Sequence, residues 1–380
     1  AGLRRPGRGG LRRPGLAALR RRQRGALRGL WCHPTARLSG TSGWWCVGPG
    51  RLSCSVVNAA ALLSLPGLED DLARLEPCLR DAVRSGDAFL EEVTTHLIDA
   101  GGKRLRPGLA LAAATGGAGG AHDDDLLGAV AVELVHLASL YHDDVMDEAA
   151  VRRNVESVNA RWGNLVAIVA GDFLLARSAE IAASLGTEIA GLLANTLGRL
   201  CQGQLSEVRV AFNTRRTEEQ YFDAIAGKTA ALMSTSCRIG ALTGGRPRSE
   251  IDALSAFGRS FGIVFQLRDD LLDVVATDEE LGKPAGQDLA EGVYTLPVLL
   301  ALRHPGVGPE LQALLGRPLG QPEREKAKSM VASSSAVGET MARAGRFVDD
   351  AVEAAGALSP PGLSRAMGEL ARGLLRDLPL

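Results

Sequence analysis

Residues 135–147 read VHLASLYHDDVMD. An apolar run leads into Asp143, Asp144 and Asp147, and the first and last of these aspartates are four residues apart. Residues four apart share one face of an α-helix, so Asp143 and Asp147 would stack on one side. Carboxylates placed so closely repel each other unless a cation neutralises them. The stretch therefore predicts a helix that ends in a cluster of negative charge.

A second stretch, FGIVFQLRDDLLDV at residues 261–274, repeats this arrangement with Asp269, Asp270 and Asp273. Two such clusters on facing helices would form an oxygen-rich cleft. Mg²⁺ suits it, because this ion takes a few carboxylates, keeps several waters and bridges to substrate phosphates. One cluster alone would indicate a solvated helix end, whereas two copies favour a metal site. The acidic triplet at residues 123–125 lacks this spacing and is expected to cap a helix.

Basic residues lie near the carboxylates in the sequence, as a diphosphate ligand requires. GGKRLRP at residues 101–107 places three cations in a turn whose glycines let the backbone approach a ligand closely. An arginine pair follows the first acidic cluster, and arginine binds phosphate through a planar fork. A lone lysine is more often a surface cation, and a lone histidine is more often a core residue. The prediction of a phosphate-binding site therefore rests on the clustering of these residues. The candidates are Lys103, Arg104, Arg106, His136, Arg152, Arg153, Lys228, Thr229 and Lys283.

The composition predicts one large helical domain. The 380 residues are 46% hydrophobic and rich in Ala, Leu and Gly, and alternating strand patterns are absent. The formal net charge of -1 gives no electrostatic case for nucleic acid. The six cysteines contain no CxxC pair, and no run of about 18 apolar residues exists, so we expect a cytoplasmic protein with at most peripheral membrane contact.

Residues 1–60 form a separate segment, with twelve Arg and no Lys, Asp or Glu. We interpret residues 1–60 as a disordered basic extension, of the kind that a GC-rich bacterial genome encodes, and residues 61–380 as the folded domain. An organellar transit peptide is the second interpretation, because such peptides are also rich in arginine and poor in acid. A basic arm for nucleic acid is the third.

Five segments in order resemble the trans-isoprenyl diphosphate synthase (polyprenyl synthetase) family. They are GGKRLRP at 101–107, HDDVMDEAAVRR at 142–153, GKT at 227–229, FQLRDDLLD at 265–273 and GKPAGQDLAEGVYTLP at 282–297. The resemblance runs from about Leu65 to the C-terminus. It implies an all-α orthogonal bundle around a central cavity, usually a homodimer, that condenses isopentenyl diphosphate with an allylic diphosphate.

The resemblance also assigns roles to the site residues. About three Mg²⁺ (or Mn²⁺) ions would be held by Asp143, Asp144, Asp147, Asp269, Asp270 and Asp273. The allylic diphosphate would be contacted by Arg152, Lys228 and Lys283, with support from Gln266 and Thr229. Isopentenyl diphosphate would be bound by Lys103, Arg106, His136 and Arg153. Two departures from the family pattern are Val293, where a lysine is common, and Asn154, where a glycine is common but asparagine tolerates the same turn.

The residues just before the first aspartate cluster predict the length of the product. In the family, a bulky aromatic four or five residues before the first aspartate blocks the cavity, and here those positions are Ser139 and Ala138. We therefore expect a long-chain product, such as the precursor of a quinone side chain, with geranylgeranyl or farnesyl diphosphate as the alternative. A class I terpene cyclase would lack GGKRLRP, and a non-catalytic subunit of a heteromeric synthase would lose the aspartate motifs, so both are more distant.

Overall fold

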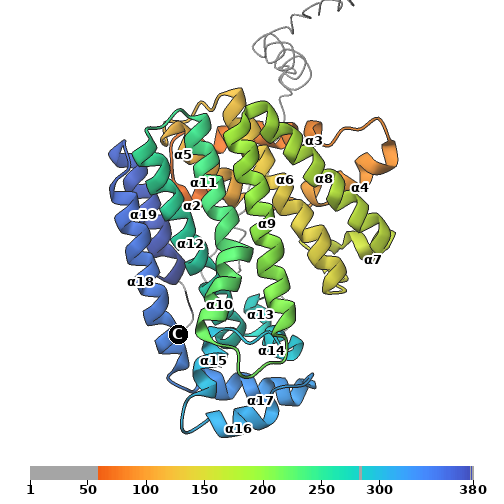
Figure 1. Cartoon of the computed structure of the whole chain (residues 1–380), viewed down its shortest axis with the longest axis vertical. Coiled ribbons are helices and arrows are strands. Elements are labelled where there is room, and N and C mark those ends of the chain that lie inside the picture. The colour runs from red at the N-terminus through yellow and green to blue at the C-terminus, as the bar shows by residue number, and fades with distance from the viewer. Residues whose placement is uncertain (1–58, 282–284, 377, 379–380) are drawn as a thin grey trace, which may run out of the picture. The chain divides into compact units, whose positions relative to one another are not determined.

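The structure of this chain is a computed structural model that describes residues 59–281, 285–376 and 378. Most of the described chain is helical (Figure 1). The helices are α2 (Ala59–Leu63), α3 (Leu68–Ala82), α4 (Ala88–Asp99), α5 (Leu105–Thr115), α6 (Asp123–Met146), α7 (Val158–Trp162), α8 (Asn164–Leu185), α9 (Thr187–Arg209), α10 (Glu218–Ile225), η1 (Ala226–Ala230), α11 (Ala231–Thr243), α12 (Arg248–Val275), α13 (Asp278–Leu281), α14 (Gln287–Glu291), α15 (Leu296–Leu302), α16 (Gly308–Leu314), α17 (Gln321–Ala332), α18 (Ala336–Gly356) and α19 (Pro361–Arg376). Within the described residues, the strands are β1 (Val151–Arg152) and β2 (Val155–Glu156), an antiparallel pair.

The long helices α6, α8, α9, α11 and α12 form the centre of the bundle. Helix α6 packs along α8, and α11 packs against α5, α6, α9 and α12 (Figure 1). Small residues let these helices approach closely: a Cβ on Gly240 of α11 would lie 1.9 Å from the carbonyl oxygen of Ala110 on α5. The apolar runs before both aspartate clusters are buried in this core, as their composition predicts.

Two stretches of the chain with continuous helical periodicity are each divided into two helices. The pattern over Glu69–Ala100 reads as continuous, but α3 ends at Ala82 and Gly86 follows with a φ of 82°. The carboxylate of Asp87 then caps α4 by accepting from the N–H groups of Phe89 and Leu90. Similarly, Gly163 separates α7 from α8. Both breaks contain a glycine with a positive φ, a conformation that glycine adopts easily. The helical periodicity of the surrounding residues hides this local signal in the sequence.

The hairpin of β1 and β2 places the arginine pair after the first acidic cluster. Its two-residue turn consists of Arg153 at φ 52° and Asn154 at φ 63°. Positive φ at both central positions is typical of the type I′ turn, in which Asn is favoured. The expectation that Asn154 can replace a glycine here is therefore confirmed.

The folded part of the chain includes Ala59 and Ala60, which belong to α2. Ala59 is buried and its N–H donates to the carbonyl of Lys103 at 2.9 Å, so these two residues of the predicted extension pack with the folded part. The rest of the predicted extension, residues 1–58, lies outside the described residues. Among those that are described, we find no helix long and apolar enough to cross a membrane.

Candidate active site

A large cavity lies among α6, α8, α9 and α12, with a volume of about 1000 Å³. The turn between α4 and α5, the hairpin turn and the π-helical segment η1 contribute the remaining walls. Twelve of the residues singled out in the sequence line it: Lys103, Arg104, Arg106, His136, Ser139, Asp143, Arg153, Asn154, Lys228, Thr229, Gln266 and Asp269. The first aspartates of both clusters therefore share one cavity, although 126 positions separate them in the chain.

At the end of α6 the three aspartates differ in their surroundings. Asp143 lines the cavity, and Asp147, the C-cap residue of α6, is exposed. Burial raises the pKa of Asp143, Lys228 lowers it, and the like charge of Asp147 raises it. Asp144 is fully buried and accepts from Nε of Arg152 at 2.7 Å. Asp144 therefore holds Arg152 in place and does not itself line the cavity.

On α12 only the first aspartate lines the cavity. Asp270 is buried and accepts hydrogen bonds from the hydroxyl of Tyr221 and, at 2.9 Å, from Nε2 of Gln266. Burial raises the pKa of Asp270 to about 7. Asp273 accepts from the backbone N–H groups that begin α14, including that of Gly286 at 3.1 Å. Asp270 and Asp273 thus hold the end of α12 against its neighbours while Asp269 lines the cavity.

Lys228 is placed at the cavity by the π-helical segment η1. Its Nζ lies 2.8 Å from Oε2 of Glu207 on α9. Burial alone would lower the pKa of Lys228, but Glu207 and Asp143 outweigh it and the pKa is raised, so the ammonium stays charged. The next residue, Thr229, donates to Oε1 of Gln266 at 2.7 Å. Single π-turns inside helices are often found at functional sites, because they push a side chain out of the regular ladder.

The cations expected to bind isopentenyl diphosphate gather at another wall. Burial lowers the pKa of Arg106 to about 10, and its Nε is buried without a hydrogen-bond partner. Burial and the neighbouring arginines, Arg106 foremost, lower the pKa of His136 well below its usual value, so its ring is neutral at pH 7. Lys103 is exposed at the rim. An anion entering here would meet several donors and few competing carboxylates.

Other residues from the sequence analysis lie elsewhere. Five described residues are not part of the cavity lining: Asp144, Asp147, Arg152, Asp270 and Asp273. Ala138 is fully buried and does not line the cavity either, whereas Ser139 does. Lys283 lies outside the described residues. The acidic triplet caps as expected, since Asp125 accepts from the N–H of His122 at 2.9 Å.

Sequence reasoning missed several partners of the site. Glu207 pairs with Lys228, Tyr221 donates to Asp270, and the buried Glu133 belongs to the basic wall of the cavity. Glu133 had a local signal, because it precedes His136 by three residues and so shares its face of α6. Glu207 and Tyr221 had none, because only the packing of α9 and α10 brings them to the site.

The apolar part of the cavity lies below Asp143. Ser139 is one helical turn from Asp143 and Val135 two turns, and both line the cavity. Leu175 of α8 and Leu197 of α9 also line the cavity. This region can hold a hydrocarbon tail whose charged end remains among the aspartates and cations.

Comparison with known proteins agrees with this geometry. The model of the polyprenyl synthetase family matches residues 87–333. The chain belongs to this family. Component 2 of the heptaprenyl diphosphate synthase of Geobacillus stearothermophilus is 41% identical over 323 residues, covering 82% of this chain and 95% of the relative. The nonaprenyl diphosphate synthase of Mycobacterium tuberculosis is 41% identical over 250 residues, covering 65% and 74%.

Solved structures of family members have the same fold. The decaprenyl diphosphate synthase of Rhodobacter capsulatus is 33% identical, with a TM-score of 0.76 over 83% of this chain and 98% of that one. A polyprenyl synthase from Caulobacter crescentus, complexed with calcium and isoprenyl diphosphate, is 32% identical, with a TM-score of 0.76 over 86% and 98%. The expectations of an all-α fold, of a prenyltransferase and of a long-chain trans-prenyl diphosphate synthase are confirmed.

Proposed function

We propose that the six aspartates and the cations around the cavity carry out the condensation of isopentenyl diphosphate with an allylic diphosphate. The observation that supports this most directly is the shared cavity of Asp143 and Asp269, with Lys228 beside the first and Arg106 near the second. Two acidic faces with cations between them fit a diphosphate held through divalent ions. The apolar space below them fits the prenyl tail.

Magnesium fits the donor set. All side chains offered by the two clusters are hard oxygen donors, which Mg²⁺ prefers. Among the described residues, no three acidic, His or Cys side chains already stand as a complete metal cage. Mg²⁺ is commonly bound by one or two carboxylates with substrate phosphates completing its shell, so an open arrangement suits it. Asp143, Asp147 and Asp269 would hold the ions, which neutralise diphosphate as it leaves.

The basic residues around the cavity would bind the two substrates separately. Lys228 and Arg152 would bind the allylic diphosphate and stabilise its growing charge as the C–O bond breaks and the electron pair leaves with diphosphate. Lys103, Arg106, His136 and Arg153 would hold isopentenyl diphosphate with its double bond toward the allylic carbon. That double bond forms the new C–C bond, and the proton lost afterwards passes to the departing diphosphate. We assign no nucleophile to the protein.

The supporting contacts suggest a narrower role for three aspartates. Asp144, Asp270 and Asp273 are held by Arg152, by Tyr221 and by backbone N–H groups. We propose that these carboxylates position the ligands and that Asp143, Asp147 and Asp269 contact the ions. Val293 would leave the allylic side with one cation fewer than is common in the family.

The test combines the purified protein with Mg²⁺, farnesyl diphosphate and labelled isopentenyl diphosphate, and sizes the products. We expect linear prenyl diphosphates longer than geranylgeranyl diphosphate, formed only when a divalent ion is present. Products no longer than geranylgeranyl diphosphate would contradict the long-chain assignment. Cyclised hydrocarbon, or no incorporation in the presence of both substrates, would contradict the proposed roles of the site.

We also propose that the chain functions as a homodimer in the cytoplasm. Apolar side chains are exposed on one pair of neighbouring helices, Leu165 and Val169 of α8 and Val208 of α9, and a second copy would cover them. The relative from Geobacillus is named as one component of its enzyme, so a different partner chain is the competing outcome. Light scattering on the purified chain distinguishes these: a stable dimer with full activity supports our proposal, and an inactive monomer contradicts it.

A further inference from the structure

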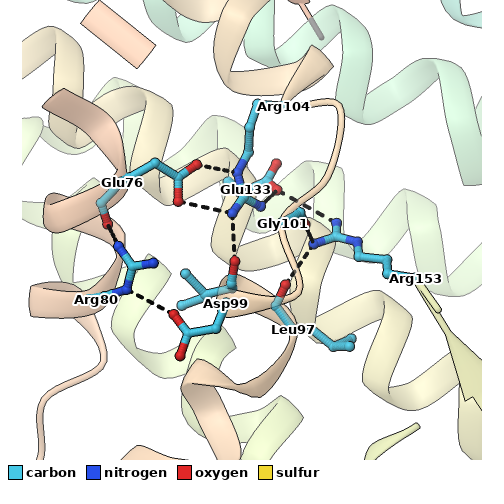
Figure 2. A network of polar contacts seen from close by, with 9 residues as sticks. Glu76, Arg80, Leu97, Asp99, Gly101, Arg104, Glu133 and Arg153 are labelled. Carbon is cyan, nitrogen blue, oxygen red and sulfur yellow. Dashed lines mark hydrogen bonds and ion pairs between the residues drawn. The ribbon is translucent and has the colours of Figure 1, made fainter. Parts of the chain in front are cut away.

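A network of ion pairs and hydrogen bonds, most of it buried, joins residues at the basic wall of the cavity (Figure 2). At its centre is the guanidinium of Arg104. Its Nε and Nη2 contact the carboxylate of Glu76 at 2.7 and 3.1 Å, its Nη1 contacts Oε1 of Glu133 at 2.9 Å, and Nη2 also donates to the carbonyl of Ile98 at 2.9 Å. Arg104 is 6% exposed and Glu133 1%. These contacts leave its guanidinium committed to protein groups.

Arg104 therefore differs from its two neighbours in the GGKRLRP turn. Lys103, Arg104 and Arg106 all border the cavity, but the guanidinium of Arg104 is paired with Glu76 and Glu133 and so anchors the turn. Its backbone has a φ of 48°, in the left-handed region that costs a non-glycine residue roughly 1 kcal/mol or more. A strained conformation persists only where surrounding contacts hold it, and the contacts of the Arg104 side chain do so.

A second arginine holds the start of the same turn. Nη1 of Arg153 donates to the carbonyl of Leu97 at 2.8 Å and also to the carbonyl of Gly101 (Figure 2). Its guanidinium lies against Gly102, where an added Cβ would be 2.9 Å from Cζ. Nη2 of Arg153 faces Oε1 of Glu133 at 3.9 Å. The carboxylate of Glu133 thus faces both arginines that fix the turn, one on each side.

We infer that Glu133 and Arg104 are positioning residues for the isopentenyl diphosphate site. Together with Glu76 they clamp the turn of residues 101–106 in the conformation that presents Lys103 and Arg106 to the cavity. Neither residue needs to touch substrate for this. The inference rests on the proposed function, and it identifies which buried contacts give that site its shape.

The test compares steady-state kinetics of Glu133→Gln and Arg104→Lys with those of the wild type. Gln keeps the shape of Glu but removes the charge that both arginines face, and Lys keeps the charge of Arg104 but cannot form its fork. We expect the KM for isopentenyl diphosphate to rise about tenfold or more, as expected when one charge-assisted contact is lost. The KM for the allylic diphosphate should stay within about twofold, because none of the network contacts reaches Lys228 or Asp143. Glu133→Asp should recover part of the loss.

The matched control is Arg80→Gln, which removes another ion pair between α3 and α4. Nε of Arg80 contacts Oδ1 of Asp99 at 2.8 Å on the exposed side of the network (Figure 2). This variant should leave both KM values unchanged.

An inactive wild type would contradict the proposed function, and the positioning role that rests on it would fail with it. With an active wild type, an equal rise of both KM values, or a lower melting temperature with unchanged KM values, would overturn the inference. If Glu133→Gln does not fold, Arg104→Lys decides by the same criteria.

Discussion

The depth of the apolar cavity makes a quantitative prediction about product length. Ser139 lines the cavity four residues before Asp143, which corresponds to about 6 Å along the helix axis, and Val135 lies eight residues before it, about 12 Å. Replacing Ser139 with Phe would place a ring across the cavity one turn below the aspartates. The space below that point, roughly half of this depth, would no longer be open to the tail.

The neighbouring residue provides the contrast. Ala138 satisfies the same sequence rule as Ser139 but is fully buried away from the cavity. We expect Ala138→Phe to overpack the core and to lower the free energy of unfolding by roughly 1–3 kcal/mol. Its effect on product length should be secondary to this loss of stability. The Phe substitution at Ser139 is thus expected to change product length, whereas the same substitution at the preceding residue is expected to change stability.

The assay sizes products made from farnesyl diphosphate and labelled isopentenyl diphosphate, and thermal unfolding of each variant is measured in parallel. Ser139→Phe should shorten the longest product while the first condensation continues and the melting temperature stays near that of the wild type. Ala138→Phe should lower the melting temperature. Full-length products from a well-folded Ser139→Phe enzyme would refute our placement of the tail. Shortened products from an equally stable Ala138→Phe enzyme would refute the placement of that residue.

Four further outcomes are expected. Asp143→Ala and Asp269→Ala should each reduce turnover about a hundredfold or more in single-turnover assays with Mg²⁺ while circular dichroism stays helical; near-normal turnover in either would exclude its role. Gly240→Ala should lower the free energy of unfolding by roughly 1–3 kcal/mol or more in denaturant titrations, because its Cβ would meet a backbone carbonyl of α5; equal stability would contradict that contact. Cys201 lines the cavity and should react with iodoacetamide more slowly when a diphosphate substrate is bound, as peptide mass spectrometry can measure. Burial raises the pKa of Cys237 to about 12, so it should remain unmodified in the native protein, and its rapid labelling would contradict this.

The sequence alone determined the class of fold, and it predicted the chemistry of the site. Helical periodicity is local, and the four-residue spacing of Asp143 and Asp147 already defines a helix face. A single cluster of like charges can be solvated at a helix end, but two spaced aspartate clusters together with a glycine-opened basic turn indicated a diphosphate bound through metal ions. The interruptions at Gly86 and Gly163 were harder to predict, because a single glycine changes an average pattern very little.

Tertiary structure decided which of these residues reach the cavity. Asp143 and Asp144 are adjacent in sequence, yet one lines the cavity and the other is buried against Arg152. Arg104 has the same charge as its neighbours in the turn, but its guanidinium is taken by Glu76 and Glu133. The reason is that the direction of a side chain and the residues that it contacts depend on helices far apart in the chain. A local pattern fixes which face of a helix a side chain occupies, and packing alone fixes what that face meets.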